Sequence, residues 1–184
     1  MGTFAMEAPA DALSRARRGD EAAFEELMRM HERQVLRTAL RLLGRLEDAE
    51  DAAQEVFLRL YRNLRGLQAL AEIRPWLYRV TVNVCYDLGR KRRRFVAELP
   101  DEMAVEQSQE SAVSLDQRRE LLTRALPYLP EKERAAVVLR EIEGLETAEV
   151  AEILGSTPVT VRAQVSTGRA KLREIVARLE RRKQ

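Results

Sequence analysis

A run of five basic residues, 90–94, is the part of the sequence best suited to contact a polyanion. It ends a helical stretch that begins near Ile73, and at about 100° per residue the polar side chains of that stretch fall within roughly one 80° sector. They are Trp76, Arg79, Asn83, Asp87, Arg90 and Arg94, and Lys91 belongs to the basic run. Like charges this close together cost stability unless an anion relieves them, which favours contact with phosphates. The alternative is a solvated helix end, where cations suit the helix dipole.

Metal and acid–base chemistry have few candidate residues. The sequence contains one cysteine, Cys85, and one histidine, His31. A single cysteine excludes an internal disulfide and a cysteine-based zinc site. Charged residues make up 34% of the chain but the net charge is only +2, so any basic surface must arise from local placement. We expect no metal, no cofactor and no catalytic residue.

The basic run must be positioned by an apolar stripe on the same helix. Residues spaced by three and four predict a helix packed on a core; they are Ile73, Leu77, Val80, Val84 and Leu88. Another face carries Tyr78, Val82, Cys85 and Tyr86. The helix is therefore either packed between two partners or leaves an apolar surface for another protein. Cys85 is expected to be a buried thiol.

The chain before Ile73 predicts three further helices, over residues 12–18, 20–43 and 47–64. Gly19 and Gly44 are natural helix stops, and Asp20 can cap the second helix. The apolar series of the third helix includes Tyr61. Its other side is acidic at the start and basic at the end, so stabilisation of the helix dipole is the alternative to a binding role for the acidic cluster.

The composition changes after residue 97, where acidic residues occur without Lys or Arg up to Asp116. We predict an all-α fold of two small helical domains, residues 1–97 and 115–184, joined by an acidic flexible linker, residues 98–114. Few glycines, 5% aromatic residues and abundant Ala, Leu, Glu and Arg favour helices over strands.

The second domain ends in a helix-turn-helix pattern. Thr147 can cap a short helix that Gly155 ends, and Thr157 with Pro158 can start the next. Ala151 and Gly155 supply a small residue at the helix crossing and a permissive residue in the turn. An ordinary helical hairpin is the alternative.

Two blocks of the sequence resemble the extracytoplasmic-function (ECF) sigma factors, small two-domain initiation subunits of bacterial RNA polymerase. D-A-E-D-A-A-Q-E-V-F, from Asp48 to Phe57, looks like the family's polymerase-binding motif, and W-L-Y-R-V-T-V-N, from Trp76, looks like its promoter-melting helix. L-P-E-K-E-R, from Leu129, and the helix-turn-helix resemble the domain that binds the upstream promoter element. The resemblance covers about residues 11–97 and 115–178.

The resemblance implies three contact surfaces. Core polymerase would be bound through its clamp coiled coil by Asp48, Asp51, Gln54 and Glu55. The −10 element would be contacted by Trp76, Arg79, Asn83, Arg90, Lys91 and Arg94, with Trp76 also a candidate for the core. The −35 element would be read in the major groove by Thr160, Arg162, Ala163, Ser166 and Arg169, while the same domain touches the polymerase flap. The acidic linker would follow the path that RNA later takes, and an anti-sigma factor is an expected partner.

The sequence departs from the family pattern in the recognition helix and the melting loop. Val159 to Gln164 stand where Gly-Thr-Val-Lys-Ser-Arg is common, which favours phosphate contacts over base readout. Leu67 to Leu70 replace a Phe followed by polar and Gly residues. Gly168, inside the recognition helix, is expected to cost about 1 kcal/mol relative to alanine.

Other functions are still open from sequence alone. A helix-turn-helix regulator that acts without polymerase is one alternative, although the acidic, apolar helix from Asp48 argues against it. An all-helical enzyme or scaffold is the other, but no catalytic constellation supports it. No segment has the length of a signal peptide core or a membrane span, so we expect a cytoplasmic, non-enzymatic protein.

Overall fold

The computed structural model describes residues 9–96 and 121–181, with side chains at residues 11–91 and 121–181. Helices are the only regular elements in these ranges, which confirms the predicted all-α fold class. The predicted linker, residues 98–114, lies outside them.

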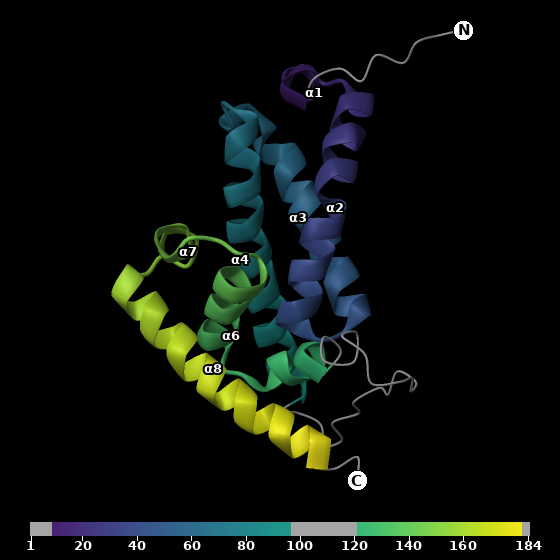
Figure 1. The fold of residues 1–184 in the computed structure, drawn as a ribbon. Coiled ribbons are helices and arrows are strands. Elements are labelled where there is room, and N and C mark those ends of the chain that lie inside the picture. The colour runs from purple at the N-terminus through teal and green to yellow at the C-terminus, as the bar shows by residue number, and fades with distance from the viewer. Residues whose placement is uncertain (1–8, 97–120, 182–184) are drawn as a thin grey trace, which may run out of the picture.

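The N-terminal domain consists of α1 (Pro9–Arg17), α2 (Glu21–Leu43), α3 (Leu46–Asn63) and α4 (Leu70–Val96), with a 3₁₀ turn, η1 (Leu64–Gly66), before α4. The three long helices pack side by side, with α1 across one end (Figure 1). Asp20 caps α2 as predicted, because its carboxylate accepts a hydrogen bond of 3.1 Å from the backbone N–H of Ala23. Gly44 ends α2 in the left-handed conformation, with φ of 80°.

The helix that carries the basic run begins earlier than its apolar stripe predicts. It starts at Leu70, which places Pro75 inside the helix instead of in its first turn. Proline has no N–H for the carbonyl of Ala71. Ala71 and Pro75 are both exposed, so water can satisfy that carbonyl.

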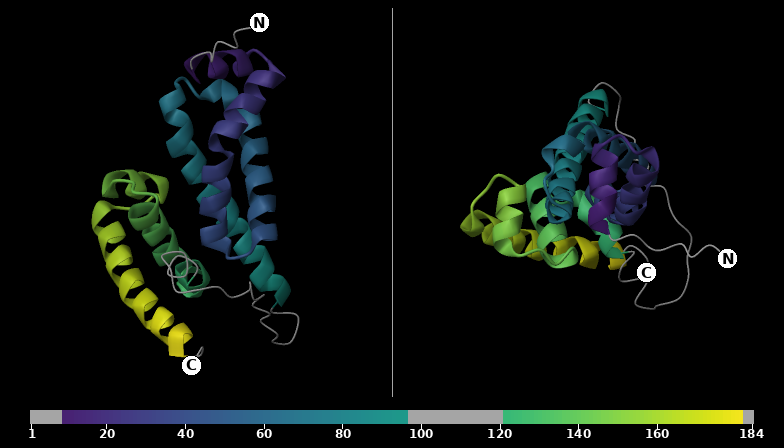
Figure 2. Two further views of the ribbon diagram at one scale, coloured as in Figure 1. Left: turned by 45° about the vertical axis from the view of Figure 1, so that its right-hand side comes forward. Right: turned by 90° about the horizontal axis from the view of Figure 1, so that it is seen from above.

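The C-terminal domain consists of η2 (Leu126–Tyr128), α6 (Glu131–Val137), a π-helical segment η3 (Val138–Ile142), α7 (Thr147–Ile153) and α8 (Pro158–Arg181). α8 runs along the outer side of the molecule (Figures 1 and 2). Its start is capped as predicted, since Thr157 Oγ1 accepts a hydrogen bond of 3.2 Å from the N–H of Thr160. The predicted cap of α7 was one residue off: Glu146, in a capping box with Glu149, caps this helix. Gly155 forms the turn with φ of 58°.

The two domains pack against each other, which settles the open question about the second apolar face of α4. Tyr78 and Val82 on that face are each 1% exposed, and their cluster includes Val138, Leu139 and Ile153 of the C-terminal domain. The hydroxyl of Tyr86 donates to the backbone oxygen of Glu131 at 3.3 Å. Helix α4 is therefore packed between its own domain and the C-terminal one.

The expectation that Gly168 only weakens α8 was incomplete, because the structure gives this glycine a packing role. It is buried where α8 crosses α6, and a Cβ there would lie 2.7 Å from Cγ2 of Val137. Glycine is required at this crossing because no other residue lets the two helices approach as closely. The sequence pattern gave no sign of this contact, since Val137 lies 31 positions earlier in another helix.

Cys85 is 3% exposed, as expected for a structural thiol, and burial raises its pKa to about 12. Because only the thiolate attacks disulfide reagents, Ellman's reagent at pH 8 should modify the native protein at least about 100-fold more slowly than the urea-unfolded protein. The raised pKa stabilises the fold fully below the ordinary value of 9.0, and this contribution is lost as the pH rises toward about 12. Cys85→Ala supplies the reagent blank, and rapid stoichiometric modification of folded protein would contradict the prediction.

Candidate nucleic-acid interface

The predicted −10 residues lie on the side of α4 that the core does not cover. Arg79, Asn83, Arg90 and Lys91 are exposed. Trp76 is half-buried and packs against the core, so its ring serves the fold while one part of it stays accessible. Arg90 forms an exposed ion pair of 2.8 Å with Asp87. The side chain of Arg94 lies outside those described, although the backbone of α4 continues past it to Val96.

The predicted −35 residues are all exposed on the first half of α8; they are Thr160, Arg162, Ala163, Ser166 and Arg169. The hydroxyl of Thr160 lies 2.9 Å from that of Thr157, so it is engaged with the cap of the helix. The buried side of α8 consists of Val161, Val165 and Gly168. The helix thus presents its polar residues outward as a recognition helix must.

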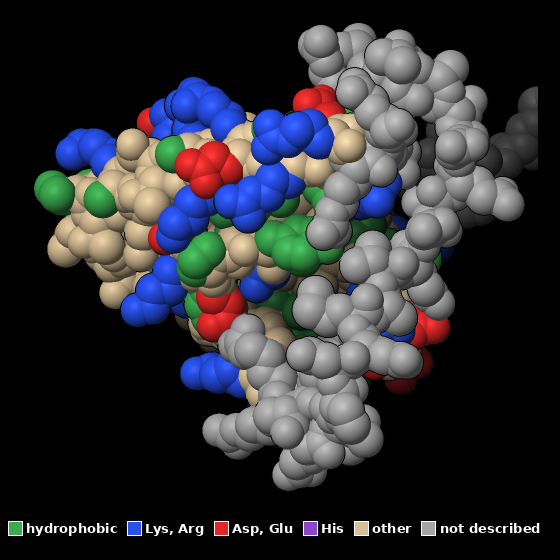
Figure 3. Space-filling view, turned by 90° about the horizontal axis from the view of Figure 1, so that it is seen from below, with side chains coloured by type: hydrophobic (Ala, Val, Ile, Leu, Met, Phe, Trp, Pro, Cys, Tyr) green, Lys and Arg blue, Asp and Glu red, His purple; other side chains and the backbone are tan. Residues whose placement is uncertain are grey.

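A groove of about 420 Å³ lies between α8 and residues of η3 and α7, and its lining includes Val161 and Val165 from the buried side of α8. Four arginines line it, and they are Arg140, Arg162, Arg169 and Arg173. Glu141 also lines the groove and lies 3.8 Å from Arg169. A surface with this excess of positive charge suits phosphate groups. Figure 3, a view of the molecule from below, shows Lys and Arg side chains in several groups with Asp and Glu side chains between them.

Sequence reasoning missed Arg140, which comes from η3 and not from the helix-turn-helix. The π-helical segment explains the omission: an extra residue in the turn shifts every later side chain around the axis, so a projection at 100° per residue no longer places them. Only the folded structure brings Arg140 beside Arg162 and Arg169, with which it lines the same groove.

The predicted polymerase-binding residues form one side of α3. Asp51 and Gln54 are exposed, Asp48 is half-buried, and Glu55 pairs with Arg59 at 2.7 Å. Two large apolar side chains on this helix are also exposed, Leu58 by 50% and Tyr61 by 54%. Tyr61 was expected in the core; instead its ring lies edge-on to Phe24 with centroids 5.1 Å apart, at the margin of the α2–α3 contact. Exposed apolar residues beside acidic ones are typical of a protein-binding surface.

A second groove, of about 520 Å³, brings residues of two predicted surfaces together. Asp51 and Glu55 of α3 line one side, and Arg90 and Lys91 of α4 line the other. The acidic face and the basic run are thus neighbours in space, although 35 residues or more separate them in the chain.

The described residues contain no group of three or more His, Cys, Asp or Glu side chains that could hold a metal ion. Within the same ranges, no helix has the length and apolar character needed to cross a membrane.

Two family models match the chain, sigma-70 region 2 at residues 27–95 and sigma-70 region 4 at residues 119–172. The chain is 36% identical over 166 residues to the ECF RNA polymerase sigma factor SigM of Mycobacterium tuberculosis, an alignment that covers 88% of this chain and 81% of SigM. The chain belongs to the ECF sigma factors. Members of this family are transcription regulators that serve RNA polymerase in promoter recognition and transcription initiation.

Other relatives agree with this assignment. The sigma factor is 39% identical over 168 residues to SigE of Mycolicibacterium smegmatis, covering 87% of this chain and 65% of that relative. Among solved structures it is similar to CnrH in complex with the cytosolic domain of CnrY, with a TM-score of 0.65, 25% identity, and coverage of 90% of this chain and 95% of CnrH. The sigma factor RpoE of Bartonella quintana, in complex with the anti-sigma factor NepR, shares the fold with a TM-score of 0.67 at 22% identity, over 84% of this chain and 96% of RpoE.

Proposed function

We propose that this sigma factor directs core RNA polymerase to promoters through three separate surfaces. We assign the acidic side of α3 to the polymerase clamp, the polar side of α4 to the −10 element and the exposed side of α8 to the −35 element. The boundaries of the two units, residues 1–97 and 115–184, stay a prediction. The observation that carries the proposal is that one chain exposes an acidic, partly apolar helix face and two basic helix faces.

At the −10 element, Arg79, Arg90 and Lys91 would neutralise phosphates while Asn83 and the accessible part of Trp76 contact unpaired bases. Aromatic and amide side chains suit a strand that has left the duplex, because a base can stack on the first and form hydrogen bonds with the second. Arg94 would extend the contact along the backbone.

At the −35 element, Arg162, Arg169, Arg140 and Arg173 would bind phosphates along one side of α8, because all four line the same groove. Thr160, Ala163 and Ser166 face outward but are short, so base-specific contacts would be few and close. The pair between Glu141 and Arg169 must separate or be shared with a phosphate when DNA binds.

We also propose an anti-sigma factor as a regulatory partner, since RpoE of Bartonella quintana was solved with the anti-sigma factor NepR. A protein with one polymerase surface and two DNA surfaces needs such control, because each can bind non-specifically. We place its action in the cytoplasm, where polymerase and DNA are found.

The function is tested by open-complex formation. Purified core polymerase is incubated with genomic promoter fragments, with and without the protein, and unpaired thymines are mapped by permanganate. We expect melting at discrete sites only when the protein is present, and those sites then give the −10 and −35 sequences. Stable binding to duplex DNA with no binding to core polymerase would instead favour a regulator that acts alone.

A further inference from the structure

One carboxylate of the C-terminal domain is held by three side chains of the N-terminal domain. Glu143 follows η3, and its side chain is only 12% exposed. Thr38 of α2 donates a hydrogen bond of 3.0 Å to one oxygen, and the hydroxyl of Tyr78 donates one of 3.0 Å to the other. Arg41 of α2 donates to the same oxygen as Thr38 and forms an ion pair. Both oxygens of Glu143 therefore bind the other domain.

Thr38 and Tyr78 are held in place in the closed arrangement. Thr38 is 0% exposed and Tyr78 is 1% exposed, so neither can turn to water in this arrangement. Arg74 orients Tyr78, since its guanidinium lies 5.7 Å from the ring centroid and its Nη2 lies 3.5 Å from the hydroxyl oxygen. Burial raises the pKa of Tyr78, which keeps the hydroxyl protonated as a donor. The hydroxyl can accept from Arg74 and donate to Glu143.

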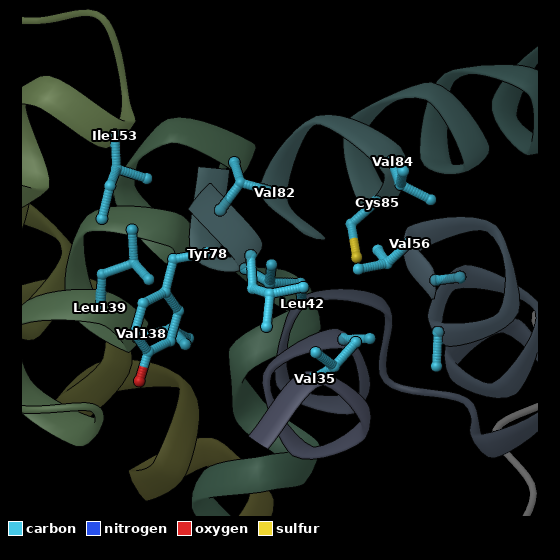
Figure 4. Packing of buried hydrophobic residues seen from close by; sticks show 14 of the residues in the cluster. Val35, Leu42, Val56, Tyr78, Val82, Val84, Cys85, Val138, Leu139 and Ile153 are labelled. Atoms are coloured by element: carbon cyan, nitrogen blue, oxygen red, sulfur yellow. The ribbon is translucent and has the colours of Figure 1, made fainter. Parts of the chain in front are cut away.

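The contact around Glu143 lies beside an apolar one. In Figure 4, Tyr78 points toward the part of the C-terminal domain that carries Val138 and Leu139, and Val82 lies near Ile153. Hydrogen bonds to a charged group contribute more than neutral ones, and more in surroundings that exclude water. A carboxylate left buried without its donors would be costly, so Glu143 favours full closure or full opening over intermediate positions.

The closed arrangement cannot place both DNA surfaces on one promoter. The −10 and −35 elements are about 25 base pairs apart, which at 3.4 Å per pair is roughly 85 Å. A compact chain of this length has a radius of gyration of about 16 Å, or a diameter of roughly 40 Å. α4 and α8 must therefore separate before straight DNA can engage both of them.

We propose that Glu143, with Thr38, Arg41 and Tyr78, forms a latch that keeps the free protein closed, and that promoter engagement opens it. The occupant of the second apolar face of α4 in the free protein is thus the C-terminal domain of the same chain. The claim that the latch reduces promoter binding rests on the proposed function. The claim that the latch keeps the free protein closed does not. Only the open fraction of molecules would be competent, which lowers the apparent affinity for a two-element promoter by that fraction.

Energy transfer between two dyes tests the latch in the free, full-length protein. Glu25 of α2 and Glu174 of α8 are exposed, so Glu25→Cys and Glu174→Cys provide labelling sites. Cys85 is buried with a raised pKa and should not compete for the dyes. Single-molecule measurements then give the populations of closed and open molecules. We expect most molecules to be closed when the latch residues are unaltered.

Glu143→Gln keeps the size of the side chain but removes its charge, and should raise the ratio of open to closed molecules about tenfold. Tyr78→Phe removes one donor and should raise it by a smaller factor. Glu152→Gln is the matched control: Glu152 is an exposed residue of α7, and its loss of charge should leave the ratio unchanged. Circular dichroism confirms that each variant is folded, and Tyr78→Phe decides the question alone should Glu143→Gln fail to fold.

A protein that is already open before any substitution would overturn the latch. So would an unchanged ratio in folded Glu143→Gln or, should that variant not fold, in Tyr78→Phe. Permanganate mapping of the same proteins separates this inference from the proposed function. Open complexes should form with Glu143→Gln at lower protein concentration than with the unaltered latch. If dye measurements show a latch but no variant supports melting, the latch stands and the proposed function fails.

Discussion

Gly168→Ala should lower the free energy of unfolding by about 1 to 3 kcal/mol, in the range of other overpacked cores. Helix propensity alone predicts the opposite sign, because alanine favours a helix over glycine by about 1 kcal/mol. The new methyl would lie 2.7 Å from Cγ2 of Val137 and 3.4 Å from both Cβ and the backbone oxygen of Glu133. Val137 is β-branched and buried, so it has little freedom to move away. Urea unfolding followed by circular dichroism measures the change.

Two comparisons identify the α6–α8 contact as the cause. Ala170→Gly, at an exposed position two residues further along α8, should cost only the ordinary propensity difference of about 1 kcal/mol. Val137→Ala should make room for the added methyl, so the double variant should be less destabilised than the sum of its single changes. A stabilised Gly168→Ala protein would mean that α6 and α8 can move apart without loss.

Replacing Asp51 and Glu55 together with alanine should weaken binding to core polymerase about 10- to 100-fold. Both carboxylates lie on the α3 surface that we assign to the clamp, beside the exposed Leu58. The fold should persist, because Asp51 is exposed and the exposed pair of Glu55 with Arg59 contributes little to stability. Fluorescence anisotropy of labelled protein titrated with core polymerase measures the dissociation constant.

A charge-matched control separates position from net charge. Glu25→Ala with Glu32→Ala removes the same charge from exposed positions on α2. We expect this pair to bind core polymerase as the parent does. Equal weakening in both double variants would point to a long-range electrostatic effect, and unchanged binding in the first would remove the clamp assignment.

The local pattern of the chain was enough to predict most of the helices and the direction of their side chains. Gly44 and Asp20 end and begin helices for reasons that lie within a few residues, so they could be recognised in advance. The exposed positions of Arg79, Asn83, Arg162 and Arg169 follow from the same periodicity. Periodicity erred at Tyr61, which lies at the margin of the apolar face, where a neighbouring helix decides between burial and exposure.

The sequence by itself determined the helical fold, the two-domain organisation suggested by its motifs and the polar faces of α4 and α8. Each of these depends on residues close together in the chain, where fixed helical geometry relates spacing to direction. Only the tertiary structure decided that Glu143 binds Thr38 and Tyr78, that Arg140 joins the arginines of α8 and that Gly168 is needed at a crossing. Those contacts join residues 22 to 105 positions apart. They depend on how whole helices pack, which no local pattern of residues records.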